Sequence, residues 1–156
     1  MAREIVYNNL IRKIGGIAES NMKTNSKLQA ICDLLKNNVP EYDWVGFYWV
    51  DMEHDRELIL GPFAGEPTEH KRIKFGEGIC GQAAETEKTF IIDDVSKEEN
   101  YLSCGINVKS EIVVPIFRNG LIIGELDIDS HAPAAFSKND EQFLTKIGEI
   151  ASQLTS

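Results

Sequence analysis

The sequence contains few of the cysteine and histidine residues that disulfide frameworks and metal sites require. Its 156 residues include three cysteines, three histidines and five prolines. An odd number of cysteines, with no CxxC pair and no secretory signal, argues against a structural disulfide framework. The histidines lie far apart in the sequence and no HExxH motif is present. We therefore expect no dedicated metal site and no cofactor.

Positive charge and long apolar runs are also scarce. Sixteen lysines and arginines stand against 25 aspartates and glutamates, which gives a net charge of -9. No basic stripe is available to neutralise phosphates, so we expect binding to neither nucleic acid nor an anionic membrane. No stretch approaches the roughly 18 apolar residues of a membrane span, and the first residues do not resemble a signal peptide. These absences predict a cytoplasmic protein.

The chain has the length and apolar content of one domain. With 156 residues, 42% of them hydrophobic, we expect a single domain over residues 1–156 that buries its own core. Apolar residues at helical spacing predict three helices, over residues 3–20, 26–37 and 139–154. Ser137 and Asp140 are placed to cap the last helix, and Asn25 or Ser26 to cap the second.

Strand-like segments occupy the middle of the chain. They cover residues 43–50, 57–63, 71–75 and 89–92, followed by two segments around Asn119-Gly120. Helices at both ends with short strands and hairpin signals between them predict an α+β fold with a mostly antiparallel sheet.

The first strand predicts a candidate pocket wall. Because side chains alternate along a strand, Trp44, Gly46 and Tyr48 share one face. The glycine between two aromatic residues would leave room for a small ligand. The alternative is a sheet that is buried on both sides.

The segment 110–129 predicts a β-hairpin, and its apolar pattern favours one register. A three-residue loop ending at Gly120 would separate apolar from charged side chains and place Glu111 opposite Asp127. A two-residue turn would instead set Ile112 beside Asp127 and mix the two kinds of side chain on one face.

This hairpin collects carboxyl groups on one face. Glu111, Asp127 and Asp129 would lie close together, so at least one pKa should be raised and one acid should be able to donate a proton. Cys104 precedes the hairpin in a long polar segment, 93–109, and is the cysteine that we expect beside these acids. The alternative is a solvated polar face.

The other two cysteines lie in helical contexts. Cys80 is flanked by glycines and is predicted in the first turn of a short helix, where the helix dipole favours a thiolate. Cys32 lies on the apolar stripe of the second helix, where a small buried hydrophobe is the usual occupant.

Several motifs together resemble those of the free methionine-(R)-sulfoxide reductases, enzymes with a GAF fold. They are Trp44-Val-Gly-Phe-Tyr48, Leu60-Gly-Pro-Phe, Gly78-Ile-Cys80-Gly, Ser110-Glu111-Ile-Val-Val-Pro-Ile and Gly124-Glu-Leu-Asp127-Ile-Asp129. The resemblance covers most of the chain. It implies a GAF-like α+β domain whose N- and C-terminal helices pack on one face of the sheet.

The resemblance also implies roles for individual residues. Cys104 would be the nucleophile, and the aromatic side chains of Trp44 and Tyr48 would enclose free methionine-(R)-sulfoxide. The acids implied to bind and protonate the sulfoxide are Glu111, Asp127 and Asp129. A sulfenic acid left on Cys104 would have to condense with a second thiol.

One departure from the family concerns that second thiol. Many members carry a further cysteine in the turn before the Cys80 motif, where this chain has residues 66–72 without one. Resemblance to a two-cysteine subgroup implies that Cys80 resolves instead, and that thioredoxin or a similar dithiol recycles the disulfide. Because one fold can carry different functions, the alternative is a non-catalytic GAF domain that senses a small ligand, or a thiol redox switch. The sequence leaves open whether the protein forms a homodimer.

Overall fold

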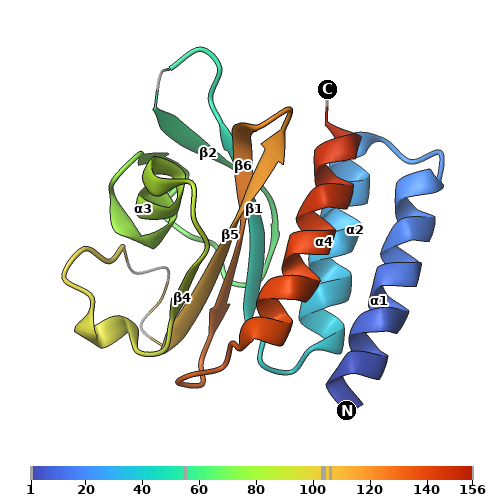
Figure 1. The fold of residues 1–156 in the computed structure, drawn as a ribbon, viewed down its shortest axis with the longest axis horizontal. Helices are drawn as coiled ribbons and strands as arrows, with labels where there is room; N and C mark the ends of the chain where they lie inside the picture. Colours follow the sequence, from blue (N-terminus) through green and yellow to red (C-terminus); the bar gives the residue numbers. More distant parts are fainter. Residues whose placement is uncertain (1, 55, 103–104, 106, 156) are drawn as a thin grey trace.

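An antiparallel sheet separates two layers of the molecule (Figure 1). The computed structural model describes residues 2–54, 56–102, 105 and 107–155. Their elements are α1 (Ala2–Glu19), α2 (Thr24–Asn38), β1 (Trp44–Val50), β2 (Glu57–Ala64), β3 (Arg72–Lys74), α3 (Gly78–Thr86), β4 (Phe90–Ile92), the 3-10 helix η1 (Val95–Lys97), β5 (Ser110–Arg118), β6 (Leu121–Ser130) and α4 (Lys138–Leu154).

The strand order is β3-β2-β1-β6-β5-β4, and every neighbouring pair is antiparallel. The helices α2 and α4 pack on one face of the sheet, with α1 lying outside them, and α3 packs on the other face (Figure 1). This arrangement confirms the predicted α+β class, including the terminal helices on one face. None of the described helices is long and apolar enough to cross a membrane.

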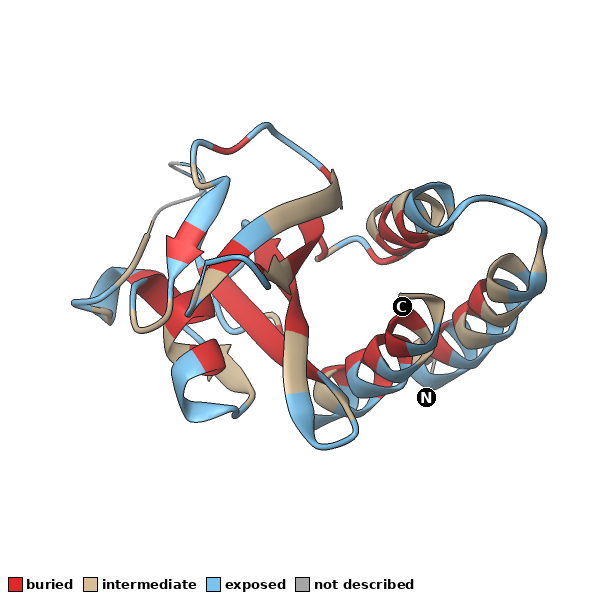
Figure 2. Cartoon of the chain, turned by 90° about the horizontal axis from the view of Figure 1, so that it is seen from above, coloured by how far each residue is buried: buried red, intermediate tan, exposed pale blue. Residues whose placement is uncertain are grey.

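The helical layer forms because α2 and α4 each carry an apolar stripe. Leu28, Ile31 and Leu35 of α2 are buried, as are Leu144 and Ile147 of α4. Figure 2 shows these inner helix faces as buried and the outer faces as exposed. Cys32 is fully buried on the α2 stripe, as predicted, and burial raises the pKa of its thiol far above the ordinary value.

The predicted cap of α4 is confirmed, and that of α2 is wrong. The Ser137 backbone N–H donates to Asp140 Oδ2 at 2.9 Å, closing a capping box. Asp140 is buried and also accepts hydrogen bonds from the hydroxyls of Tyr42, at 2.7 Å, and Tyr7. Helix α2 begins at Thr24, two or three residues earlier than a cap at Asn25 or Ser26 would require. Its N-cap is Lys23, without a side-chain hydrogen bond.

Strand β1 is buried on both faces, the alternative considered for it from the sequence. Val45 and Phe47 belong to the apolar cluster under the helices, whereas Trp44 and Tyr48 belong to a second cluster with α3. The two aromatic residues therefore share a face, as predicted. That face is covered by α3 and its flanking loops.

The predicted register of the hairpin is wrong by two residues. Asn119 and Gly120 form a two-residue turn with φ of 52° and 79°, so Arg118 pairs with Leu121. Two-residue turns of this kind are favoured because their backbone twist matches that of the flanking strands. The pattern of apolar residues carries no information about this preference. A bulge around residue 123 then moves the pairing by one more residue.

Because turn and bulge each move the pairing by one residue, the acids of both strands still share a face. Glu111 lies opposite Asp129, and Asp127 lies opposite Val113. At the bulge, two side chains lie on the opposite face of the sheet from the one predicted. Ile122 packs in the α3 layer and Ile123 in the helical layer.

Candidate active site

Four buried carboxyl groups line the face of β5 and β6 that is covered by α3. On β6, Glu125, Asp127 and Asp129 are 0%, 0% and 1% exposed, and on β5 Glu111 is 3% exposed. Their two-residue spacing on β6 places them on the same face of the strand. Burial this complete excludes a solvated polar face.

Cys80 lies directly against these acids. The helix α3 that carries it packs on β3, β5 and β6. The close approach depends on glycine, because a Cβ at Gly81 would lie 2.5 Å from the carbonyl oxygen of Lys74. Cys80 Sγ and carboxyl oxygens of Glu111 and Asp127 all lie within 4.8 Å of one another.

This proximity corrects an expectation from the sequence, in which Cys104 alone was placed next to the acids. A cysteine 31 residues upstream of Glu111 reaches the cluster because α3 crosses back over β5 and β6, a contact that chain order does not reveal. Cys104 lies outside the described residues. Its place beside the cluster stays a prediction.

The electrostatics of the cluster favour protonated carboxyl groups. Burial raises the pKa of Glu125 well above its usual value, and the neighbouring charge of Asp127 raises it further, against the opposing contact with Cys80. Burial also raises the pKa of Asp127, against the opposing influence of the neighbouring Glu111 and Cys80. In the described part of the chain, no cationic side chain forms an ion pair with Glu125 or Asp127. The cluster therefore contains at least one acid able to donate a proton.

The donor atoms of this cluster could in principle take a divalent cation. Metal ligands must first lose their protons. Here burial raises the pKa of Glu125 and of Asp127, which favours the forms that keep their protons. We therefore assign the cluster to proton transfer.

The aromatic wall is held by backbone carbonyl groups of the segment after β2. Trp44 Nε1 donates to the carbonyl of Glu66 at 2.9 Å, and the Tyr48 hydroxyl donates to the carbonyl of His70 at 2.8 Å. The expected free space at Gly46 is not present. A Cβ there would lie 2.4 Å from Cη2 of Trp44, so the missing side chain makes room for the indole ring.

Two hollows adjoin the acids. An enclosed space of about 10 Å³, enough for about one water molecule, is lined by residues that include Tyr48, Cys80, Glu111 and Asp127. A second hollow, of about 340 Å³, is lined by residues that include Trp44, Asn107 and Asp129. Since Asp127 and Asp129 are two residues apart on one face of β6, the hollows are neighbours. All of the predicted site residues within the described chain thus line one of them.

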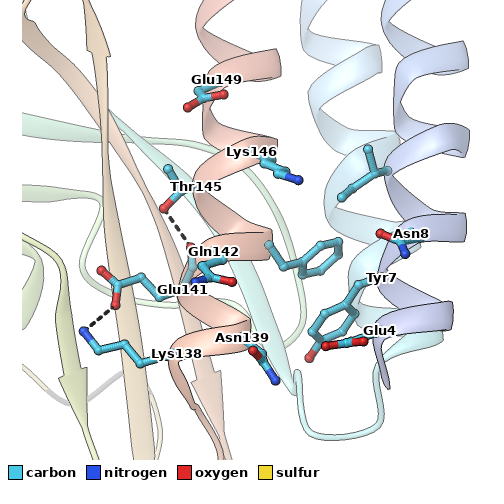
Figure 3. A pocket seen from close by; sticks show the side chains of 12 residues that line it. Glu4, Tyr7, Asn8, Lys138, Asn139, Glu141, Gln142, Thr145, Lys146 and Glu149 are labelled. Atoms are coloured by element: carbon cyan, nitrogen blue, oxygen red, sulfur yellow. Dashed lines mark hydrogen bonds and ion pairs between the residues drawn. The ribbon is translucent and has the colours of Figure 1, made fainter. Parts of the chain in front are cut away.

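A larger hollow of about 680 Å³ lies in the helical layer, between α1 and α4 (Figure 3). Its lining is mainly polar and carries both signs of charge, including the ion pair of Lys138 with Glu141 at 3.0 Å. No cysteine is among the described residues that line it. It offers none of the redox chemistry that the acid cluster suggests.

The sequence reasoning missed two kinds of site residue. Glu125 was not among the predicted functional residues, although its two-residue spacing from Asp127 in the sequence was a usable signal. His70 and Leu102, which line the enclosed space, come from loops. No local pattern marks such residues.

Comparison of the sequence with models of known protein families identifies the class to which this fold and site belong. Residues 26–155 match the model of the GAF domain. The chain therefore belongs to the GAF domain family.

Similar proteins of known function identify the enzyme family within the GAF domain family. The free methionine-R-sulfoxide reductase of Saccharomyces cerevisiae is 33% identical over 95% of this chain and 84% of its own length. A crystal structure of the Neisseria meningitidis free methionine-R-sulfoxide reductase in complex with its substrate is 34% identical, with a TM-score of 0.88 over 95% of this chain and 87% of that one. The type II enzyme of Thermoplasma acidophilum is 42% identical, with a TM-score of 0.79 over 84% of this chain and 91% of that one. The chain belongs to the family of free methionine-R-sulfoxide reductases.

Proposed function

We propose that this protein reduces free L-methionine-(R)-sulfoxide to methionine, with Cys104 as the nucleophile and Cys80 as the resolving thiol. The observation that carries the proposal is the buried contact of Cys80 with the carboxyl groups of Glu111 and Asp127. A thiol beside protonated acids has what sulfoxide reduction requires, since the oxygen must be protonated before methionine can leave. The family of the chain supports the same substrate.

In the first step, the sulfoxide oxygen is transferred to the sulfur of Cys104. The Cys104 thiolate attacks the sulfoxide sulfur while a carboxylic acid of the cluster protonates the sulfoxide oxygen. Methionine leaves after gaining two electrons, and Cys104 is left as a sulfenic acid. We assign three acids to substrate contact, because each lines one of the two hollows: Glu111, Asp127 and Asp129.

The second step forms a disulfide. The sulfur of Cys80 attacks the sulfenic sulfur of Cys104, the S–O bond breaks and water leaves. A dithiol such as thioredoxin then reduces the disulfide. We propose that this occurs in the cytoplasm, within a single domain over residues 1–156, and that a homodimer is compatible with it.

Size would restrict the substrate to a free amino acid. Trp44 and Tyr48 are held in place by hydrogen bonds to the backbone of the segment after β2. The hollow beside Trp44 measures about 340 Å³. We expect it to admit methionine sulfoxide and to exclude a methionine held in a polypeptide chain.

Thioredoxin-coupled NADPH consumption tests the proposal. We expect turnover with the R epimer of free methionine sulfoxide and not with the S epimer or a peptidyl sulfoxide. Cys104→Ser should abolish turnover. Equal rates on the peptide, or sustained turnover by Cys104→Ser, would contradict the assignment.

The alternatives give different results in the same experiment. A non-catalytic sensor would bind the sulfoxide without releasing methionine. A thiol redox switch would form its disulfide with peroxide and show no preference for the sulfoxide. Release of methionine from the R epimer excludes both.

A further inference from the structure

One thiol and two carboxyl groups converge beneath α3 from three different elements. Cys80 lies on α3, Glu111 on β5 and Asp127 on β6, and Figure 1 shows α3 packed against this side of the sheet. Their residues are 5%, 3% and 0% exposed. Cys80 Sγ and one carboxyl oxygen from each acid all lie within 4.8 Å of one another. We call these three side chains the donor trio.

Within the donor trio, the carboxyl group of Asp127 stands out for its lack of partners. Neither of its oxygens has a hydrogen-bond partner in the described chain, although the side chain is fully buried and lines the enclosed space beside Cys80. No lysine or arginine is among the described residues that line this space. A carboxyl group without partners is costly to bury, whether charged or protonated. Packing alone does not account for an acid at this position.

We propose that the donor trio of the reduced protein binds a zinc ion. Zn²⁺ binds cysteine sulfur at about 2.3 Å and carboxylate oxygen at about 2.0–2.2 Å, so the ligand atoms of a tetrahedral site lie about 3.3–3.8 Å apart. A group of atoms within 4.8 Å of one another therefore needs to close by no more than about 1.5 Å. The adjoining space of about 10 Å³ has room for about one water molecule as the fourth ligand.

The kinds of donor atom in the trio favour zinc over the common hard cations. Mg²⁺ and Ca²⁺ bind oxygen ligands, whereas a thiolate is a soft ligand. Zn²⁺ accepts both cysteine sulfur and carboxylate oxygen, and three protein ligands with one water molecule is a usual arrangement for it. We expect Co²⁺ to bind as a substitute for Zn²⁺, and Mg²⁺ and Ca²⁺ not to compete.

A bound zinc ion and the proton transfer assigned to this cluster exclude each other. As the ion enters, the thiol becomes a thiolate and the acids become carboxylates, so up to three protons pass to the solvent. The charge of the ion then offsets negative charges that would otherwise repel one another. An ion held here would occupy Cys80 and displace the protons that sulfoxide reduction requires. Inhibition therefore rests on the function proposed above, whereas binding does not.

Other titratable groups face the same space and act on the affinity from outside the donor trio. Tyr48, His70 and Glu77 line the space. Glu125 lies two residues before Asp127, on the same face of β6. None of these four belongs to the group of donor atoms that lie within 4.8 Å of one another. Because binding releases protons from the trio, the affinity for Zn²⁺ should rise with pH.

The test is isothermal titration calorimetry of the reduced protein with Zn²⁺. We expect one ion per chain, and proton release detected by repeating the titration in buffers of different ionisation enthalpy. Cys80→Ser and Asp127→Asn should each weaken binding by at least the roughly 10–100-fold that loss of an outer-shell partner costs. The matched controls are Cys32→Ser, a buried thiol of the helical layer, and Glu85→Gln, an exposed acid of α3. Both controls should leave the affinity unchanged.

Replacing zinc by cobalt gives a measurement that needs no variant. Co²⁺ bound to a thiolate absorbs in the near ultraviolet by charge transfer from sulfur, and its visible bands report the coordination geometry. Both signals should appear when wild type is titrated with Co²⁺. They should disappear when Zn²⁺ is added, because Zn²⁺ competes for the same ligands, and should persist when Mg²⁺ is added.

Three results would overturn the zinc site. The first is the absence of one-to-one binding by reduced wild type, and the second is the absence of a thiolate band with Co²⁺. The third is wild-type affinity in Cys80→Ser, which would show an adventitious surface site only. In wild type, half-maximal inhibition of methionine release should occur at the Kd for Zn²⁺. Zinc binding by a protein that releases no methionine would refute only the proposed reductase.

Discussion

Replacing Gly46 by alanine tests whether the position of the Trp44 ring matters to the site. The added Cβ would lie 2.4 Å and 2.7 Å from two atoms of the indole and 2.9 Å from Cβ of Phe63. The Phe63 atom is fixed close to its backbone, so the rigid indole must move. That movement would disturb its stacking on Phe63, now at 5.5 Å between ring centroids, and its hydrogen bond to the carbonyl of Glu66.

The size of the effect follows from overpacking a buried site. Inserting a methyl group into a filled interior costs about 1–3 kcal/mol of unfolding free energy. In a chain of this length each 1 kcal/mol lowers Tm by about 2–4 °C, so we expect a Tm lower by about 2–12 °C. If Trp44 encloses the substrate, a loss of about 1 kcal/mol of contact also raises KM about fivefold.

Thermal unfolding and steady-state kinetics of the purified variant measure both effects. Gly16→Ala is the matched control, because nothing lies within 4 Å of a Cβ at that exposed position of α1. Alanine in a helix should stabilise the protein by about 0.5–1 kcal/mol and leave KM unchanged. An unchanged Tm and KM in Gly46→Ala would refute the close packing and with it the role of the Trp44 wall.

Three further predictions concern the thiols and acids. Cys80→Ser should release one methionine per enzyme and then stall, whereas Cys32→Ser should turn over fully; mass mapping that finds Cys32 in the disulfide would contradict this. Asp127→Asn should slow methionine release without unfolding the protein, as checked by circular dichroism, and a wild-type rate would remove Asp127 from the chemistry. The raised pKa of Glu125 means that the folded state holds more protons than the unfolded state above the usual value of 4.5, so stability should fall as pH rises above that value. Urea unfolding should show a smaller fall in Glu125→Gln, and an equal fall in both proteins would show that Glu125 does not hold its proton in the fold.

Local spacing in the sequence determined the elements and their faces. A period of 3.6 gave the apolar stripes of α2 and α4, and a period of two put Asp127 and Asp129 on the same side of β6. These properties depend only on backbone geometry, so no knowledge of the partner surface was needed. The Ser137 cap of α4 is local in the same sense.

Tertiary structure decided the distances between segments that are far apart in the chain. A two-residue turn and a bulge set the pairing of Glu111 with Asp129, although the apolar pattern was equally compatible with a register two residues away. Because side chains alternate with a period of two, such an even shift keeps the acids of both strands on their predicted face and is invisible to pattern analysis. Ile122 and Ile123, beside the bulge, change faces. Likewise, the sequence around Cys80 does not predict that this residue lies beside the acids of β5 and β6. The packing of α3 across the sheet brings the thiol to them, and the chemistry of the site depends on that contact.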